Sequence, residues 1–465
     1  MSENQIPAHN GAAAGVPHLR RVLKLRDLIF YGIIVITPVA PIPIFGVVQQ
    51  VSGGHALTTI LIAMAAMVLT AISYGRMASI YPQAGSAYTY VGLGLNAHLG
   101  FMAGWAMFLD YMMIPLLNTV YVAVTIHDQL LPQVPYWILA MLTIGVMTIL
   151  NWRGIRVTAN ANTMFILVSS FVIGVFTIVA VRYLWLKDGW HGLFSLQPLY
   201  NPRTFRWGAV LAGTSLASLT YIGFDGVTTL AEDVENPRRN ILLATVLVCV
   251  LTGLFSGLQV YLGQRIWPDF ETYPNVDTAY MDVTRRLGGP VIFGSPILLT
   301  MMAGIVIAAN FGSGLGGQVG AARLLFGMGR DKVLPGKVFA YLDHRSNPTF
   351  NIAIVGLLAF VGTLFMSFAQ CAAILNFGAF LAFMGVNLAC LWQFYCVRQT
   401  GRERSFFKDA VVPAVAFLFT LAIWLGLSKS AKIIGGCWFL AGLVYLAVRT
   451  RGFRVKPSMI DFSQT

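Results

Sequence analysis

Twelve apolar runs of membrane-spanning length follow one another along this chain, separated only by short polar stretches. A helix needs about 20 mostly apolar residues to cross the hydrocarbon core of a bilayer. We therefore expect an all-α membrane protein with about 12 transmembrane helices. The predicted spans are 27–50, 56–80, 98–126, 134–151, 157–182, 208–232, 240–264, 291–325, 350–368, 371–397, 410–428 and 431–449.

The composition supports a membrane domain and argues against a nucleic-acid partner. Charged residues make up 11% of the chain and hydrophobic residues 57%, whereas a soluble domain carries about 25% charged residues. The formal net charge is +13, which in a nucleic-acid-binding protein would form a basic patch on a folded surface. Here the basic residues lie in the loops between spans, so membrane lipid is the expected surrounding.

The basic residues also predict the orientation of the chain. With the N-terminus placed in the cytoplasm, 21 Lys and Arg residues fall on the cytoplasmic side and 9 on the other. Cytoplasmic loops carry the excess of Lys and Arg, so both termini are predicted to be cytoplasmic in a multi-pass protein of the cell inner membrane. No short apolar region with a cleavage site precedes the first span, which we expect to be retained.

Two of the predicted spans are interrupted. Pro38, Pro41 and Pro43 stand within six residues of the first span, and prolines so placed cannot belong to a continuous helix. The sixth span has a weaker break at Gly223–Gly226. A proline kink alone is the simpler interpretation of the first span. A break in the first span of each half is more specific, and is typical of inverted-repeat transporters that bind substrate at mid-membrane.

Two acidic residues, Asp110 and Asp225, fall deep within predicted spans, and Glu232 lies at the end of one. A charge at the centre of a membrane helix costs about 2.5–3.5 kcal/mol on insertion scales. The side chains serve either a structural role, such as capping a broken helix, or the binding of substrate or ion. We hypothesise that Asp110 or Asp225 changes protonation during a transport cycle.

Other chemistry is poorly supported. The seven histidines lie outside the span cores and the five cysteines have no metal-ligand spacing, so neither a metal site nor a cofactor is expected. Gly312, Gly314 and Gly317 match a nucleotide-binding pattern, but they lie in an apolar span and indicate close helix packing. A membrane enzyme is one alternative to a transporter, but the chain lacks a Gly-x-Ser-x-Gly nucleophile elbow. A channel is the second alternative.

Three segments resemble the amino acid–polyamine–organocation (APC) family. They are Pro82–Tyr90 with Gly100–Trp105, Tyr221–Arg239, and Arg323–Pro335. The resemblance covers roughly residues 20–450. Ser73-Tyr74-Gly75 and Leu109-Asp110-Tyr111 are most similar to the putrescine-importer-like branch.

The resemblance implies a LeuT-type fold, with two inverted five-helix repeats and two accessory helices. The corresponding divisions are a tail at 1–26, repeats at 27–205 and 206–397, accessory helices at 398–449, and a tail at 450–465. Substrate would lie between the breaks of spans one and six, flanked by spans three, eight and ten. The function implied is secondary-active transport of amino acids or polyamines, such as putrescine, by alternating access.

The expected substrate-binding residues come from these breaks and from the flanking spans. They are Thr37, Pro38, Ala40, Tyr111, Tyr221, Gly223, Phe224, Asp225 and Asn310, with Ser313 beside the last. Candidates for coupling to a proton or sodium ion are Asp110, Asp225 and Ser169. Carbonyl groups at the end of a half-helix carry partial negative charge, to which Asp225 would add a full one, so an amine is the expected ligand. Ion-coupled uptake is expected, and amine exchange is the alternative.

The sequence departs from the family pattern in four places. Pro38-Val39-Ala40 occupies the first break, where glycines are usual, and Pro38 has no amide to offer a substrate carboxylate. Pro43 stands where the putrescine-importer-like branch carries an acidic residue. Ser169 replaces the lysine of proton-coupled relatives, and Leu219 replaces the aromatic gate of span six.

Overall fold

The computed structural model describes residues 23–81, 86–154, 159–231, 234–292, 295–330, 335–343, 347–397 and 404–455. Glu232 and the motif segments 82–85 and 331–334 lie outside the described residues. The helices of the first half are α1 (Leu25–Ile36), α2 (Phe45–Val51), α3 (Ala56–Ile80), α4 (Ser86–Gly94), α5 (Ala97–Gln129), α6 (Tyr136–Trp152) and α7 (Ala159–Leu193).

The second half begins with α8 (Trp207–Ala217) and the 3-10 turns η1 (Ser218–Tyr221) and η2 (Phe224–Leu230). There follow α9 (Pro237–Ile266), η3 (Phe270–Thr272), α10 (Ala279–Arg286), strands β1 (Val291–Ile292) and β2 (Ser295–Pro296), α11 (Ile297–Arg330), α12 (Gly336–Phe339), α13 (Thr349–Thr363) and α14 (Phe368–Leu391). The π-helical turns η4 (Trp392–Cys396) and η5 (Phe406–Val411), then α15 (Val412–Leu425) and α16 (Lys429–Arg449), complete the described elements.

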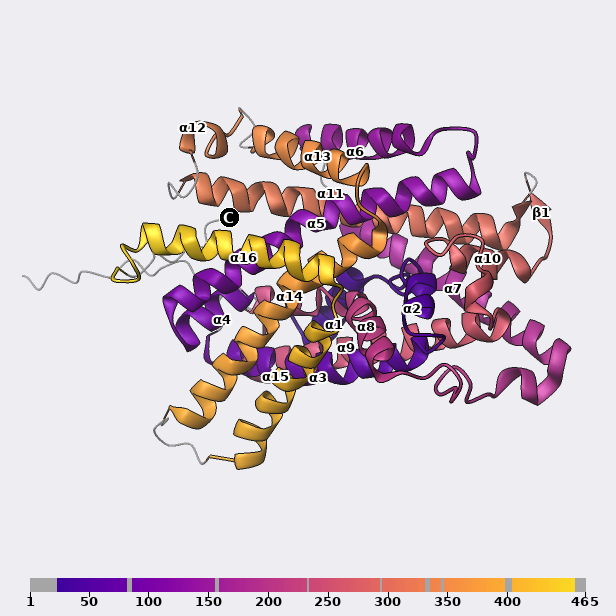
Figure 1. Ribbon diagram of the computed structural model, residues 1–465, viewed down its shortest axis with the longest axis horizontal. Coiled ribbons are helices and arrows are strands. Elements are labelled where there is room, and N and C mark those ends of the chain that lie inside the picture. The colour runs from indigo at the N-terminus through magenta and orange to yellow at the C-terminus, as the bar shows by residue number, and fades with distance from the viewer. Residues whose placement is uncertain are drawn as a thin grey trace, which may run out of the picture.

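Several long helices run nearly parallel, and we take their direction as the membrane normal, with α14 and α15 oblique to it (Figure 1). In Figure 1, helices α5, α11 and α16 run across the picture, with α10 and β1 at one end and α4 and α12 at the other. Among the described residues, nine helices are long and apolar enough to cross a membrane, and α6 and α13 are shorter apolar helices. With α1 and α2 as one interrupted crossing, they account for the twelve predicted segments of an all-helical membrane fold.

Several predicted boundaries differ from the structure by five residues or more, and the short helices α4, α10 and α12 were not predicted. The eighth span was expected to begin at residue 291, but 291–296 form the two-stranded antiparallel hairpin β1–β2 and α11 begins at Ile297. Gly288 and Gly289 both have positive φ angles, of 68° and 110°, and this turn separates the apolar run from α10 before the strands begin. Helix α4 is too short to cross the membrane and follows the motif segment at 82–85.

Both predicted helix breaks are present. Helix α1 ends at Ile36, residues 37–44 are turns, and α2 begins at Phe45, because the prolines of this segment remove helical hydrogen bonds. Helix α8 ends at Ala217, and η1 and η2 are separated by Ile222 and Gly223. Gly223 has a φ of 110°, a conformation that glycine adopts without a steric penalty.

The two accessory helices are fastened to different parts of the bundle. On α16, the Trp438 indole donates to the carbonyl of Trp105 on α5 at 3.1 Å, and Trp105 donates back to the Trp438 carbonyl at 2.9 Å. The two rings stack with centroids 4.9 Å apart. Helix α15 instead contacts α3, where Thr420 and Thr70 are hydrogen-bonded at 3.4 Å. The accessory pair therefore joins α3 to α5.

A buried ion pair strengthens the contact between α3 and the start of the accessory pair. The Arg76 guanidinium donates to the Asp409 carboxylate, whose side chain is fully buried. The guanidinium also lies over the Phe394 ring at 4.0 Å from the centroid. The other oxygen of Asp409 accepts the backbone N–H of Ser405 at 2.8 Å. These contacts connect α3, η4 and η5.

Breaking this ion pair from one side is expected to destabilise the protein strongly. Removal of one partner from a buried pair leaves an uncompensated charge and costs about 3–5 kcal/mol. Arg76→Met and Asp409→Leu should each lower the thermal unfolding temperature in detergent. The double variant should recover most of the loss, because a buried pair and an apolar replacement differ little in energy. An additive loss in the double variant would contradict this interpretation.

Candidate functional site

Asp225 lies in the second break and is tied to α4. It is the second residue of η2, directly after Phe224. Its carboxylate accepts a hydrogen bond from the Ser86 hydroxyl at 2.9 Å, and it interacts with the backbone amides of Gly223 and Gly226. The hydroxyl of Thr228 donates to the Asp225 carbonyl at 2.6 Å. One carboxylate therefore stabilises the free backbone groups of the break and connects the break to α4.

Asp110 lies on α5 where α14 approaches most closely. Its side chain is buried, and its Oδ1 atom has no hydrogen-bond partner. Gly378 of α14 allows the approach, because a Cβ atom there would stand 2.3 Å from the Ala106 carbonyl oxygen. Asp110 and Asp225 lie close enough to affect each other electrostatically. In the described part of the chain, neither carboxyl group forms an ion pair with a basic side chain.

Phe224 belongs to a cluster of four aromatic residues on the side of α4. Tyr74 on α3 is the centre of this aromatic cluster, with its ring centroid 5.4 Å from Phe224, 5.9 Å from Tyr90 and 5.8 Å from Phe383. All four side chains are at most 2% exposed. The hydroxyl groups of Tyr74 and Tyr90 are buried, beside Ser86 and Thr228 respectively. The rings of α3, α4, η2 and α14 thus fill the space beneath the second break.

The sequence prediction included Phe224 and missed the other three members of this cluster. Tyr74 and Tyr90 do lie in motifs that resemble the APC family, Ser73-Tyr74-Gly75 and Pro82–Tyr90, which was the available signal. Phe383 lies in an apolar run that contains several other phenylalanines. Nothing in that run distinguishes the one ring that meets Tyr74.

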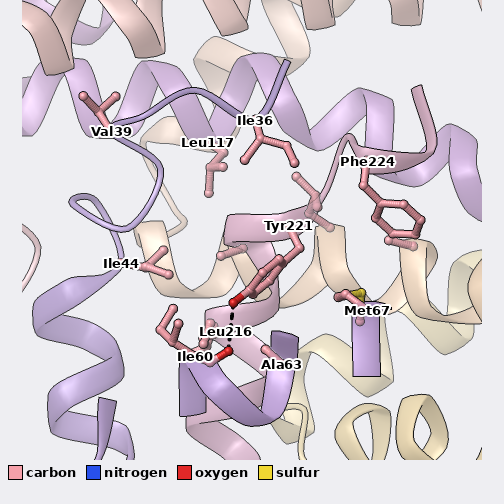
Figure 2. Close-up of a cluster of buried hydrophobic side chains, with 14 of the residues drawn as sticks. Ile36, Val39, Ile44, Ile60, Ala63, Met67, Leu117, Leu216, Tyr221 and Phe224 are labelled. Carbon is pink, nitrogen blue, oxygen red and sulfur yellow. Dashed lines mark hydrogen bonds between the residues drawn. The ribbon is translucent and has the colours of Figure 1, made fainter. Parts of the chain in front are cut away.

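The two breaks meet in one cluster of buried apolar side chains. Figure 2 shows Ile36 and Val39 from the first break together with Leu117, Tyr221 and Phe224. The Tyr221 hydroxyl points to α3, where it donates to the Ile60 carbonyl at 2.8 Å. Tyr221 thus holds η1 against α3, in addition to any role toward a substrate.

The first break is held from α9. The Gln259 side chain donates to the Pro38 carbonyl at 3.1 Å, and the Ala40 N–H donates to the Thr37 carbonyl at 3.2 Å. Thr37 has a φ of 63°, which a β-branched residue rarely adopts. The carbonyl groups freed by this break are therefore partly satisfied within the protein.

The remaining predicted residues lie on neighbouring helices. Tyr111 is half-buried against α11, where its ring would lie 3.0 Å from a Cβ atom at Gly320, and it interacts electrostatically with both aspartates. Asn310 on α11 donates to its own helix, at the Val306 carbonyl. Ser313 accepts from Asn118 at 3.2 Å. Ser169 on α7 is buried, and its hydroxyl has no hydrogen-bond partner.

The glycine pattern in the eighth span packs helices, as predicted, at two of its three positions. A Cβ atom at Gly314 would stand 2.8 Å from Met147, and one at Gly317 would stand 2.3 Å from Ile114. Gly312 faces open space, so it is not a packing residue. Within the described ranges, no three His, Cys, Asp or Glu side chains gather closely enough to hold a metal ion.

The connector between α9 and α11 is hydrogen-bonded to the end of α5. The Asp128 carboxylate, at the end of α5, accepts hydrogen bonds from the Asn275 side chain and from the Thr278 hydroxyl, the latter at 3.0 Å. Burial raises the pKa of the Asp277 carboxyl, and the negative charge of Asp128 raises it further. The connector is thus fastened to α5 by the hydrogen bonds of Asp128, and the protonated form of Asp277 is favoured beside them.

A family model described as amino acid permease matches residues 36–452. The low-affinity putrescine importer PlaP of Escherichia coli (strain K12) is 29% identical over 94% of this chain and 95% of its own length. The branched-chain amino acid permease BcaP of Lactococcus lactis subsp. cremoris is 25% identical, over 93% and 96% respectively. The vacuolar cationic amino acid transporter 4 of Arabidopsis thaliana is 30% identical, over 81% and 64%.

Substitution of Gly378 is expected to disturb the contact at Asp110. The added Cβ of Gly378→Ala would meet a backbone oxygen, which cannot rotate away, so α14 must move from α5 at a cost of about 1–3 kcal/mol. The thermal unfolding temperature in detergent should fall. Gly312→Ala is the matched control, because nothing lies within 4 Å of its Cβ position. Equal effects of the two substitutions would contradict the packing argument.

Proposed function

The chain belongs to the amino acid permease family of the APC superfamily, and on that basis we propose that it carries a small amine-bearing solute across the membrane by alternating access. Its relatives are transporters and permeases, and the chain is a multi-pass membrane transporter rather than an enzyme. The substrate class that the family supports is an amino acid or a polyamine.

The carboxyl groups of Asp110, which is buried, and of Asp225, which is half-buried, carry the preference for a cationic amine. Asp110 and Asp225 have no basic side chain to neutralise them among the described residues, and an unpaired charge inside a membrane protein is costly. An ammonium group would supply both the opposite charge and the hydrogen-bond donors. Asp110 Oδ1 is buried without a partner, and it would accept a hydrogen bond from such an ammonium group.

The first break favours an amine over a substrate held by its carboxylate. Pro38 has no N–H to donate, and its carbonyl faces Gln259. Carbonyl oxygens attract cations, whereas a carboxylate needs free amides. The similarity to a putrescine importer and to a cationic amino acid transporter supports the same substrate class.

Two sets of contacts support an alternating mechanism. The aromatic cluster of Tyr74, Tyr90, Phe224 and Phe383 fills the path on the side of α4. The hydrogen bonds of Asp128 close the connector over the other side. Substrate would enter when one set separates and leave when the other does.

We propose the same aspartates as the site of ion coupling, with uptake driven by a proton or sodium gradient. Ser169 is a further candidate, because its buried hydroxyl has no partner. The breaks in α1–α2 and in α8–η2 support two inverted repeats at 27–205 and 206–397, each beginning with an interrupted helix. The excess of basic residues on the side of the termini supports a cytoplasmic location for both ends.

Uptake into proteoliposomes tests the role of the two aspartates. Asp110→Asn and Asp225→Asn remove the charge with little change in shape, and each should reduce putrescine uptake under an imposed proton or sodium gradient by about tenfold, the value of one charged hydrogen bond. Asp188→Asn, which changes an exposed residue outside the site, should leave uptake unchanged. Unaltered gradient-driven accumulation in both aspartate variants would remove the proposal.

The same preparation separates the alternative mechanisms. Counterflow of labelled putrescine against unlabelled internal putrescine should saturate in a carrier. Strict dependence on internal substrate, with no response to either gradient, would replace coupled uptake with exchange. Ionic conductance without counterflow would favour a channel.

The cover at Asp128 is tested through Cys371, which is fully buried at the start of α14 and interacts electrostatically with Asp277. In a background with the exposed Cys396 and Cys437 replaced by serine, Asp128→Ala should accelerate maleimide labelling of Cys371 severalfold, since both hydrogen bonds of the cover are lost. Peptide mapping identifies the labelled thiol. Glu271→Ala, which changes an exposed residue of the same connector, is the control. Equal acceleration of labelling in this variant would contradict a closing role for the Asp128 hydrogen bonds.

A further inference from the structure

The end of α7 folds back on itself. Helical geometry is interrupted at Asp188 and Gly189, where Gly189 has a φ of 56° and a ψ of −134°. The short segment 190–193 then returns against the helix. A Cβ atom at Gly192 would stand 2.2 Å from the Leu184 carbonyl oxygen, so this close return requires glycine.

Contacts from α9 fix the returning segment. Arg265 donates to the carbonyl groups of His191 and Gly192, at 2.8 and 3.0 Å. The Tyr261 hydroxyl donates to the Leu193 carbonyl at 2.6 Å and accepts the Ser195 N–H at 2.9 Å. Leu193 is therefore held as a wall beside α7, independently of anything bound there.

An open groove of about 410 Å³ lies between this wall and the helix. It is lined by Thr177, Ile178, Val181, Arg182, Trp185 and Leu193. The Thr177 hydroxyl donates to the Ile173 carbonyl at 2.8 Å, and the surface of the groove is almost wholly apolar. The aliphatic stem of Arg182 therefore lines the groove, and its guanidinium lies at the rim. No ion pair of Arg182 occurs in the described part of the chain.

The groove faces lipid and ends at headgroup depth. Ile178 and Leu186 are each 71% exposed on this apolar helix, so this side of α7 faces the hydrocarbon of the bilayer. The predicted span 157–182 ends at Arg182, and Trp185 and Trp190 follow it. Trp is concentrated at membrane–water interfaces, which puts the guanidinium at the level of lipid phosphates, at the end of the bundle opposite α4 and α12 (Figure 1).

We propose that this groove binds a phospholipid of the leaflet at this end of the bundle. One acyl chain lies along Ile178 and Val181, against the wall formed by Leu193. The phosphodiester accepts hydrogen bonds from Arg182, whose planar guanidinium suits a phosphate in bidentate geometry. Trp185 packs at the interface between chain and headgroup, where membrane proteins concentrate Trp. The site is independent of the proposed transport function.

Native mass spectrometry of the full chain in detergent tests this site. The probes are dioleoylphosphatidylglycerol, dioleoylglycerol, which lacks the phosphate, and glycerol 3-phosphate, which lacks the chains. One phosphatidylglycerol molecule should bind with an affinity about tenfold above that of dioleoylglycerol, because the phosphate adds charged hydrogen bonds. Arg182→Gln should abolish this difference. Ile178→Trp, which fills the groove from an exposed position, should weaken the binding of both lipids.

The matched control is Arg203→Gln, which removes an exposed arginine that does not line the groove. It should bind phosphatidylglycerol as the wild type does, and all variants should keep the wild-type unfolding temperature. An equal loss in Arg182→Gln and Arg203→Gln would show attraction to surface charge alone and overturn the proposal. So would equal wild-type affinity for the two lipids, or binding of glycerol 3-phosphate as tight as that of the lipid.

Discussion

Backbone groups freed by a broken helix have no water to pair with inside a bilayer, and the core of this protein is arranged around that constraint. The first break is supported by Gln259 of α9, which donates to the Pro38 carbonyl. The second is supported by Asp225, which interacts with amides at the break and accepts from Ser86. In each case a polar side chain, buried for Gln259 and half-buried for Asp225, makes irregular backbone tolerable at membrane depth. The same polar atoms create the chemistry of the site.

The aspartates illustrate how structural and functional demands meet. Asp225 has enough hydrogen-bond donors around it to remain in the break without a substrate, whereas Asp110 keeps an oxygen without a partner. Neither residue has a basic neighbour to neutralise it in the described ranges. A charged pair of this kind is stabilised by whatever cation arrives, be it an ammonium group or a proton. The difference between the two environments suits a site that must bind its ligand and then release it.

Polar contacts also attach the helices at the periphery of the bundle. The accessory helices use reciprocal tryptophan hydrogen bonds and a buried ion pair to attach to α5 and α3, because apolar contact alone does not favour association of helices within lipid. At the end of α7, carbonyl groups of the returning segment are satisfied by Arg265 and Tyr261. Arg182 has no such partner in the described structure, which is why its position beside an apolar groove points to a lipid phosphate.

The sequence by itself determined which segments enter the membrane, where two of them break, and which two acidic residues lie deep inside. Length, hydropathy and proline content are local properties, so they could be identified without knowledge of the fold. The sequence did not identify Gln259 as the partner of Pro38, Ser86 as the partner of Asp225, or the contact of Phe383 with Tyr74. These pairs join residues far apart in the chain, in helices that are apolar on nearly every face. Hydrophobic periodicity then carries little information about which side of a helix meets which neighbour, and only the tertiary packing decides it.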